Sequence, residues 1–343
     1  MTLIYFILIL GITVFVHEFG HFICAKKSGI YVYEFSIGMG PKIYSFKRKN
    51  DETVYSIRLL PIGGFVQMAG EEIEKDEGIE EEKRFQSKTF FQKAITVTAG
   101  VLMNFFLAVI LYYIVGFSNG IASEELYIGE VKENSSLKVG DKILEFNGEE
   151  IKLVDIANIN LTVLMMNGED INFKIERDGK VENILVKPEK IEKEETISYD
   201  YGIKFALVES NNIFKKIFYG FIKVFTIIIQ MLLTLWYLIT GTIGLNSMSG
   251  PVGIYSLVGD VSALGIIPLI DLLALICVNV GVINILPIPA FDGGRLLFLI
   301  IEKLRGKPMD PKVENTIHTI FFLLLMLLIV VITFNDLGKV FKW

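Results

Sequence analysis

Val16-His17-Glu18-Phe19-Gly20-His21 places ionisable side chains inside a stretch of sequence that is otherwise apolar. Residues 3–16 read LIYFILILGITVFV and residues 22–25 read FICA, so the apolar stretch covers 23 residues. A helix with a rise of 1.5 Å per residue over this stretch is about 34 Å long, enough to cross the hydrocarbon core of a bilayer. Ionisable groups at such depth are costly, and they indicate either a function or a water-filled cavity.

The spacing of His17 and His21 indicates what that function is. Residues four apart share one face of a helix, so both imidazoles can bind one zinc ion. Glu18 then stands beside the metal, placed to take a proton from a water molecule that the metal activates. The plainer alternative is that the histidines only hydrogen-bond to neighbours. The chain has three histidines and two of them complete this HExxH pattern within a membrane span, which favours the metal site.

Composition sets the class of protein. The chain has 343 residues, of which 52% are hydrophobic, and its mean hydropathy is positive, as is typical of a polytopic membrane protein. The formal net charge of −6 gives no indication of nucleic-acid binding. The chain has two cysteines, Cys24 and Cys277, too few for a disulfide framework, and both fall in apolar segments as small buried residues do. The N-terminus lacks a basic region, so we expect that it is not a cleaved signal peptide.

Basic residues predict the orientation of the first span. Lys26 and Lys27 follow it directly, and further basic residues lie in the same loop at Lys42, Lys47, Arg48 and Lys49. The positive-inside rule makes this loop cytoplasmic, so the HEFGH segment lies toward the cytoplasmic end of its helix. Within the loop, VYSIRLLPIGGFVQMAG (54–70) is apolar and strand-like, and Gly63-Gly64 suits a hairpin turn. Such a hairpin is either a core element or a re-entrant sheet with an available edge.

A second span is expected at 95–117, followed by a soluble domain. Asn104 lies within this span, where an Asn most often bonds a neighbouring helix but can also line a site. Residues 121–209 alternate charged and β-branched runs, with turn pairs at Asn147-Gly148, Asn167-Gly168 and Asp178-Gly179. They predict a mainly-β domain on the exterior side. The segment SSLKVGDKILEFNGEEI (135–151) resembles the PDZ family, in which it places a short helix before a strand; PDZ domains bind extended peptides by strand addition.

The C-terminal part carries an interrupted apolar segment, NVGVINILPIPAFDGGRLLFLIIEK (279–303). Pro287 and Pro289 interrupt any helix there, and irregular backbone at membrane depth survives only where protein encloses it or it lines a cavity. Asp292 lies in this irregular piece and is the best candidate for the third ligand of a tetrahedral zinc site. The alternatives are His318 or Cys24 as the ligand, and a role for Asp292 as the cap of a helix that begins near Arg295.

Five motifs together resemble one family. They are HEFGH at 17–21, LPIGGFVQMAGE at 60–71, AGVLMNF at 99–105, SGPVGI at 249–254 and NILPIPAFDGG at 284–294. In this order, and over nearly the whole chain, they look like the site-2 protease family of intramembrane zinc metalloproteases, most of all its bacterial branch typified by the regulator-of-sigma-E protease. The resemblance implies that His17, His21 and Asp292 bind Zn²⁺ and that Glu18 is the general base.

The resemblance also implies how a substrate is held. A transmembrane helix hides its peptide bonds in its own hydrogen bonds, so it must be locally extended before cleavage, and an edge strand can replace the lost bonds. The implied functions are cleavage of single-pass membrane proteins in the bacterial cytoplasmic membrane, such as anti-sigma factors or remnant signal peptides, and binding of a peptide by the PDZ-like domain. The residues expected to bind the substrate are Gly63, Gly64, Phe65, Asn104, Asn284 and Pro287.

Three departures from the family pattern are visible. Val101 stands where the family often has Pro, Arg295 stands where His is common, and only one PDZ-like domain fits into 121–209. Two functions from other classes are the alternatives: a membrane PDZ scaffold with an inactive site, and a metal transporter that uses intramembrane His and Asp as a pathway.

The expected fold is a polytopic α-helical membrane protein with about four transmembrane helices, a re-entrant β-hairpin and an inserted mainly-β PDZ-like domain. Its three parts are residues 1–120, 121–209 and 210–343. If His17 and Asp292 both lie near the cytoplasmic face, the chain between residues 117 and 264 crosses the membrane an even number of times. The apolar segment 213–240 is therefore expected to lie along the interface, or to dip in and return, rather than to cross once.

Overall fold

The computed structural model describes residues 1–70, 78–119, 122–132, 135–150, 163, 166, 168–193, 196–209, 213–244 and 248–341. The chain forms two compact units. One consists of Met1–Val115 together with Lys223–Trp343, and the other of Gly116–Ile222. The first unit contains the HExxH segment, and the second contains most of the strands.

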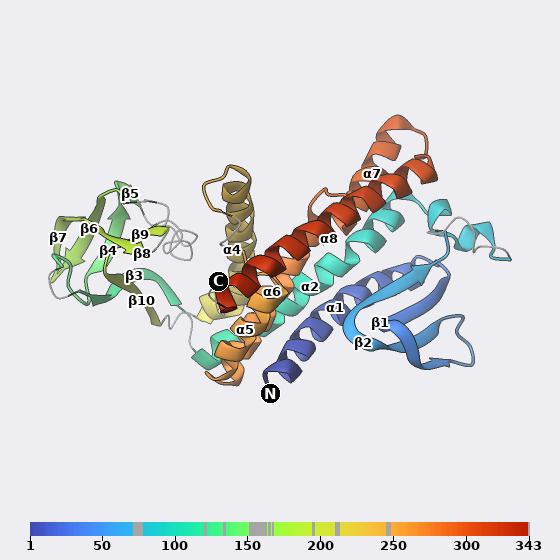
Figure 1. The fold of residues 1–343 in the computed structure, drawn as a ribbon, viewed down its shortest axis with the longest axis horizontal. Helices are drawn as coiled ribbons and strands as arrows, with labels where there is room; N and C mark the ends of the chain where they lie inside the picture. Colours follow the sequence, from blue (N-terminus) through green and yellow to red (C-terminus); the bar gives the residue numbers. More distant parts are fainter. Residues whose placement is uncertain are drawn as a thin grey trace. The chain divides into compact units, whose positions relative to one another are not determined.

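Five helices in the described residues are long and apolar enough to cross a membrane (Figure 1). They are α1 (Thr2–Lys27), α2 (Phe90–Asn119), α4 (Ile213–Ile239), α6 (Ile266–Ile285) and α8 (Pro311–Phe341). The shorter helices are α5 (Pro251–Ser262) and α7 (Asp292–Arg305), and two 3₁₀ turns, η1 (Glu81–Lys83) and η2 (Phe85–Ser87), precede α2. The chain is a polytopic helical membrane protein with an inserted β domain, as predicted.

Helices α1 and α2 run antiparallel and close together. Gly20 of α1 lies against α2, where a Cβ atom would be 2.7 Å from the carbonyl carbon of Ala99 and 2.8 Å from Cγ of Met103. Only a residue without a Cβ allows the two backbones to approach this closely. The same contact sets the register in which residues on the C-terminal half of α1 face the N-terminal half of α2.

Helices α5 and α6 pack against the N-terminal half of α1. The rings of Phe6 and Tyr255 lie 5.6 Å apart, edge to face. Ile9 shares a buried cluster with Val258 of α5 and with residues of α6 that include Leu269. Because α6 begins in this cluster, it runs from the N-terminal half of α1 toward the segment that precedes α7.

A long β-hairpin connects α1 to the 3₁₀ turns. Strands β1 (Val32–Lys47) and β2 (Val54–Met68) pair antiparallel from Lys47↔Val54 to Val32↔Met68. The hairpin is bent at Gly38, Gly40 and Gly63, whose φ angles of 86°, 85° and 87° favour glycine. The bend brings residues 34–37 beside residues 54–57 as well. Residues 64–68 and 42–47 are therefore the outer edges of this sheet.

The predicted turn at Gly63-Gly64 is wrong. Residues 54–68 form a single strand that pairs with β1, and the turn of the hairpin lies between Lys47 and Val54. Asp51 stabilises that turn, since its Oδ1 accepts hydrogen bonds from the Thr53 N–H at 3.1 Å and from Lys26 Nζ at 2.9 Å. The hairpin turn therefore forms where Asp51 bonds to the backbone, and the positive φ of Gly63 serves the bend within β2.

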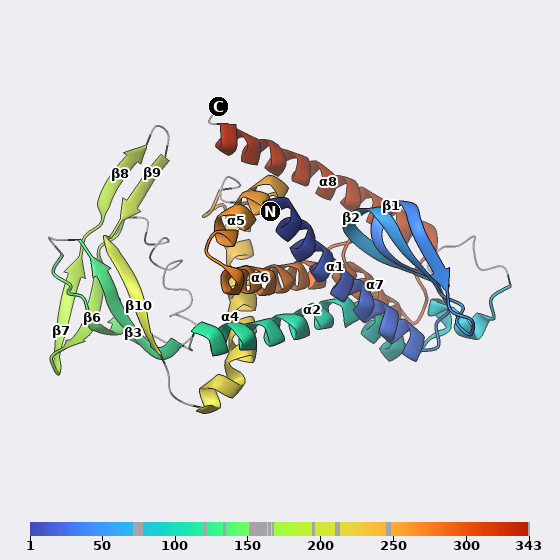
Figure 2. The same ribbon diagram turned by 90° about the horizontal axis from the view of Figure 1, so that it is seen from below.

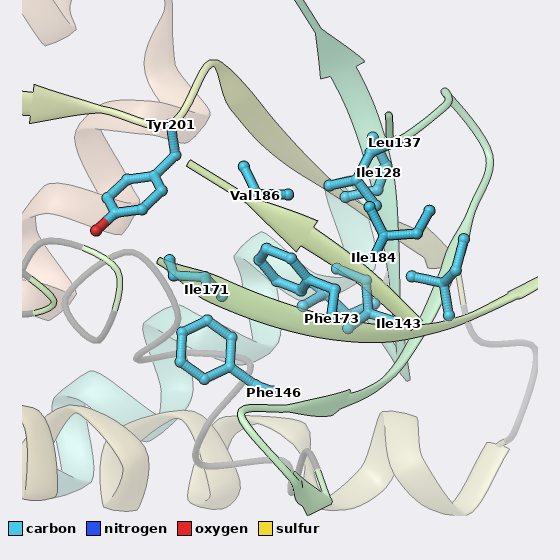
Figure 3. Close-up of a cluster of buried hydrophobic side chains, with 11 residues drawn as sticks. Ile128, Leu137, Ile143, Phe146, Ile171, Phe173, Ile184, Val186 and Tyr201 are labelled. Atoms are coloured by element: carbon cyan, nitrogen blue, oxygen red, sulfur yellow. The ribbon is translucent and has the colours of Figure 1, made fainter. Parts of the chain in front are cut away.

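The second unit is built on a twisted sheet with strand order β10-β3-β4-β6-β7, in which β5 also pairs with β4. Two further strands, β8 and β9, form a separate ribbon (Figure 2). Alternate residues of β6, Ile171, Phe173 and Ile175, are fully buried in the core shown in Figure 3. The bounds are β3 (Ala122–Val131), β4 (Lys142–Phe146), β5 (Glu149–Glu150), β6 (Ile171–Arg177), β7 (Lys180–Val186), β8 (Glu189–Lys193), β9 (Thr196–Asp200) and β10 (Ile203–Glu209).

Local predictions for this domain had mixed outcomes. The turns at Asn147-Gly148 and Asp178-Gly179 are confirmed, with positive φ at all four residues, while Asn167 lies outside the described residues. The short helix expected before a strand in 135–151 is wrong: bends and a turn lead directly into β4. Side chains favour this turn over a helix, because Asp141 Oδ2 accepts from the Lys138 N–H at 2.7 Å.

Candidate metal centre

Three side chains meet between α1 and the start of α7. The Nε2 atoms of His17 and His21 lie 3.2 Å apart, and Asp292 Oδ2 lies 3.1 Å from the first and 3.2 Å from the second. The three atoms therefore form a nearly equilateral triangle. In a tetrahedral zinc site with ligand distances of about 2.0 Å, neighbouring ligand atoms are about 3.3 Å apart. The triangle has the dimensions of one face of such a site.

A hydrogen bond to α2 fixes which nitrogen of the His21 ring carries the proton. Its Nδ1 donates to the Thr96 carbonyl of α2 at 2.8 Å, so its Nε2 carries a lone pair. That lone pair, the His17 ring and a carboxylate oxygen converge on one point, and all three residues are largely buried. Electron pairs that converge in this way repel one another unless a cation stands between them. The donor set therefore fits a zinc ion.

Gly100 of α2 makes room for both imidazole rings. A Cβ atom on Gly100 would lie 2.7 Å from Cε1 and 2.8 Å from Nδ1 of His17, and it would also collide with Nε2 of His21. The two rings thus rest on bare backbone one helical turn beyond Thr96. Any residue with a side chain at position 100 would push these two rings out of their present positions.

The segment between α6 and α7 aims the carboxylate of Asp292 at α1. Helix α6 ends at Ile285, before Pro287, and α7 begins at Asp292 itself. Gly293 and Gly294 pack directly on this segment: a Cβ on Gly294 would lie 2.7 Å from the carbonyl carbon of Ile288, and one on Gly293 would collide with the end of α6. The predicted irregular backbone is confirmed for residues 286–291. The helix expected to begin near Arg295 begins at Asp292 instead, and its N-cap residue is Phe291.

The triangle opens into a cavity of about 600 Å³. Glu18 lines this cavity next to the histidines, and residues 65–68 of the β2 edge line it from the hairpin. Gly64 packs on Glu18, because a Cβ there would lie 3.1 Å from Cγ of Glu18. The residues that line the cavity are His17, Glu18, His21, Arg58, Phe65, Val66, Gln67, Met68, Val97, Ala290, Phe291, Asp292 and Arg295.

The structure brings together only some of the predicted site residues. His17, Glu18, His21, Phe65 and Asp292 line one cavity, and Gly64 contacts Glu18. The lining of this cavity does not include the remaining candidates, Gly63, Asn104, Asn284 and Pro287. Gly63 lies in the bend of β2, Asn284 in the last turn of α6 and Pro287 just after it.

Asn104 is fully buried in α2, four residues beyond Gly100 and so on the same face of the helix. Neither its amide oxygen nor its amide nitrogen has a hydrogen-bond partner among the residues that the structure describes. Buried amides normally have hydrogen-bond partners, so Asn104 is an exception among the described residues.

Sequence reasoning missed Arg58, which lines the cavity from β2. Its guanidinium donates to Glu34 Oε1 and to the Gly40 carbonyl, both at 2.8 Å, and lies 4.8 Å from the centre of the Phe65 ring. Burial raises the pKa of Glu34, but hydrogen bonds from Lys42, Ser56 and Arg58 outweigh it and hold that pKa below its ordinary value. The ion pair therefore fixes Arg58 and Phe65 at the mouth of the cavity.

The buried triangle of two histidines and an aspartate could hold a metal ion, and a glutamate stands beside it. The helix that carries both histidines is long and apolar enough to cross a membrane, which is the arrangement of an HExxH metalloenzyme embedded in a membrane. The model of Peptidase family M50 matches residues 5–328, and the chain belongs to this family. It is a zinc metalloendopeptidase of the site-2 protease type, in agreement with the motifs in its sequence.

Curated relatives align over nearly their whole length. The chain is 35% identical over 422 residues to the zinc metalloprotease RasP of Geobacillus kaustophilus, with 99% of this chain and 98% of the relative covered. It is 33% identical over 422 residues to the regulator of sigma-W protease RasP of Bacillus subtilis, with 99% of each covered. The zinc metalloprotease RasP of Bacillus licheniformis is 33% identical over 423 residues, again with 99% of each covered.

Proposed function

We propose that His17, His21 and Asp292 hold the zinc ion, and that Glu18 is the general base in hydrolysis of peptide bonds within transmembrane segments of other proteins. The observation that carries the proposal is the triangle of ligand atoms with sides of 3.1 to 3.2 Å, open to the cavity that Glu18 lines. When bound, zinc supplies a Lewis acid that polarises the scissile carbonyl and lowers the pKa of water. The Glu18 carboxylate accepts the proton from that water and passes it to the leaving amine.

The β2 edge is the proposed binding site for the substrate backbone. Residues 64–68 pair with β1 on one side only, and residues 65–68 line the cavity. An extended peptide that pairs with this edge recovers the hydrogen bonds lost when its helix unwinds. Gly63 and Gly64 support this role, the first by allowing the bend of β2 and the second by letting the strand approach Glu18.

Asn104, Asn284 and Pro287 remain predictions for substrate binding. Asn284 can donate and accept hydrogen bonds at the end of α6, and Pro287 keeps the segment after it from becoming helical. The unpaired amide of Asn104 supports a role in the site, since it is a buried polar group without a partner in the described chain. Replacement of either Asn by Ala is expected to raise KM more than it lowers kcat.

We infer four complete spans, with α4 in the interface or dipping into the membrane. Helix α2 runs antiparallel to α1, and α5 packs at the N-terminal end of α1, so α2 ends and α5 begins on the same side of the helical unit. If α4 crossed the membrane once, the residues between α4 and Pro251 would have to cross back through the lipid as non-helical chain, with their backbone groups lacking hydrogen bonds. Cysteine-accessibility labelling that puts 121–209 and 245–262 in opposite compartments would overturn this topology.

The proposed location is the bacterial cytoplasmic membrane, with the β domain outside. Lys26 and Lys27 end α1, and Lys303 and Arg305 end α7, on the side where the metal centre lies. The β domain is proposed to bind peptides as PDZ domains do. Proposed substrates are single-pass regulators such as anti-sigma factors, or remnant signal peptides; the name of the Bacillus subtilis relative, a regulator of sigma-W protease, supports the first.

The test of the base is Glu18→Gln in the full-length protein. The variant keeps the size of the side chain but cannot accept a proton, so cleavage of a transmembrane substrate should fall by about 10²- to 10⁴-fold while bound zinc stays stoichiometric. Glu81→Gln, in an exposed 3₁₀ turn, is the matched control and should cleave normally. Full activity of the Glu18 variant would refute the assignment. An inactive scaffold would purify without stoichiometric zinc, and a metal transporter would show zinc flux in proteoliposomes.

A further inference from the structure

Ala290 has an unusual backbone conformation two residues before Asp292. Its φ angle is 109°, and the other described non-glycine residues with positive φ are Asn147 and Asp178, both in turns. Asn and Asp tolerate this region, but Ala has no side-chain group that compensates for the strain. Such strain persists only where surrounding contacts enforce it.

The contact that enforces it comes from the last span. The Ala290 N–H donates to Nδ1 of His318 in α8 at 3.1 Å. The His318 ring also packs edge-on against Phe298 of α7, with ring centres 5.3 Å apart. His318 therefore contacts both the strained segment and the helix that begins with Asp292.

Little slack separates Ala290 from the carboxylate of Asp292. Phe291 donates its N–H to the Ile288 carbonyl at 3.1 Å, and its own carbonyl accepts from the Gly294 N–H at 3.1 Å. Gly293 and Gly294 pack directly on the preceding backbone. A change in the backbone conformation of Ala290 would therefore move the start of α7, and with it Asp292.

We propose that His318 is a positioning residue of the metal centre: by accepting the Ala290 N–H, it holds the strained segment in the conformation that aims Asp292 at His17 and His21. The inference rests on the proposed ligand set. His318 acts through the backbone and not as a ligand, since its Nδ1 is occupied by Ala290. The bond requires an unprotonated Nδ1, so the ring proton resides on Nε2, which lies 3.9 Å from Oε1 of Glu314.

The experiment measures zinc affinity of the full-length protein in detergent by competition with a chelator. In His318→Asn the amide oxygen stands near the place of Nδ1 and can still accept, so affinity should stay within about threefold of wild type. In His318→Gln and His318→Leu no acceptor reaches Ala290, and affinity should fall by about 10- to 100-fold, as for the loss of other groups that orient metal ligands. A packing role alone would make the smaller Asn the worst of the three, and that order would overturn the proposal.

A second background separates the hydrogen bond from general damage to α8. Glycine adopts positive φ without strain, so a glycine at position 290 should hold this conformation without the hydrogen bond to His318. Adding Ala290→Gly to His318→Leu should therefore restore most of the zinc affinity that His318→Leu loses. Equal losses in both backgrounds would overturn the proposal. Thr319→Val is the control. The Thr319 hydroxyl donates to the Asn315 carbonyl of its own helix at 2.8 Å, so this variant should bind zinc normally.

A further variant distinguishes failure of this inference from failure of the proposed function. His17→Ala removes a proposed ligand and should lose stoichiometric zinc. If it retains zinc, the ligand set itself is wrong. If it loses zinc while all His318 variants bind as wild type does, the ligand set stands and the positioning role of His318 is refuted.

Discussion

Gly100→Ala is the substitution for which the structure gives the sharpest expectation. The added methyl would lie 2.7 Å from Cε1 of His17, and ordinary contact between carbon atoms begins at about 3.4 Å. The His17 ring would therefore move by about 0.7 Å, and His21, whose Nε2 is nearer still, would move further. Metal sites tolerate deviations of about 0.2 Å in ligand distances, so both ligands would leave coordinating position.

The same substitution should leave the fold intact. Overpacking a buried site costs about 1–3 kcal/mol, and alanine gains about 1 kcal/mol over glycine in a helix. The net cost in the free energy of unfolding is then about 0–2 kcal/mol, while zinc affinity should fall at least 10- to 100-fold. Stability and metal binding are thus expected to separate in this variant.

The assay combines zinc analysis after dialysis, cleavage of a transmembrane substrate and thermal unfolding. Gly259→Ala is the matched control, since a methyl there meets only the side chain of Thr2 at 3.3 Å, far along α1 from the histidines. It should bind zinc and cleave as wild type does. If Gly100→Ala binds stoichiometric zinc with wild-type affinity, the two imidazoles do not rest on the α2 backbone as described, and the reasoning fails.

Two further predictions concern stability. Burial raises the pKa of Asp141, but the Arg177 guanidinium and the Lys138 N–H outweigh it and hold that pKa below its ordinary value. The ionised Asp141 carboxylate therefore stabilises the fold fully above the ordinary carboxyl pKa of about 4, and this stabilisation is lost as the pH falls through the lower pKa of the folded state. Amide hydrogen exchange of β6 should accelerate in acid for the wild type, and less so for Asp141→Asn. At the other end of the chain, Asp336 Oδ2 accepts from the Gly250 and Gly253 N–H groups at 2.8 Å each. Asp336→Ala should lower the free energy of unfolding by about 1–2 kcal/mol and speed amide hydrogen exchange in α5. Unchanged protection of α5 would show that the Asp336 carboxylate does not cap the start of this helix.

Local signals in the sequence predicted the helices of the metal centre. The apolar runs around HEFGH and at 95–117 each formed one helix, and Pro287 and Pro289 marked the irregular segment that precedes Asp292. These predictions succeeded because length, apolarity and helix-breaking residues act within a few neighbours. Asp292 was recognisable because a carboxylate in irregular backbone at membrane depth needs a compensating partner.

Non-local contacts set the limits of prediction. The hairpin was misread because Gly63-Gly64 resembles a turn, whereas its true function as a bend appears only when β1 is paired with β2. Gly100 contacts His21, which is 79 residues away in the sequence, and His318 contacts Ala290, which is 28 residues away. No periodicity in the sequence identifies such pairs. Two of the three departures from the family pattern are single residues: Arg295 lines the cavity, while Val101 is buried in α2 outside the described lining.

Zinc K-edge X-ray absorption on the purified full-length protein and on Asp292→Ala tests the account most directly. Wild type should hold one zinc per chain, with two imidazole nitrogens and carboxylate oxygen at about 2.0–2.1 Å. Asp292→Ala should lose the carboxylate contribution together with most of the bound metal. Zinc that remains stoichiometric in that variant, with an unchanged spectrum, would contradict the central claim.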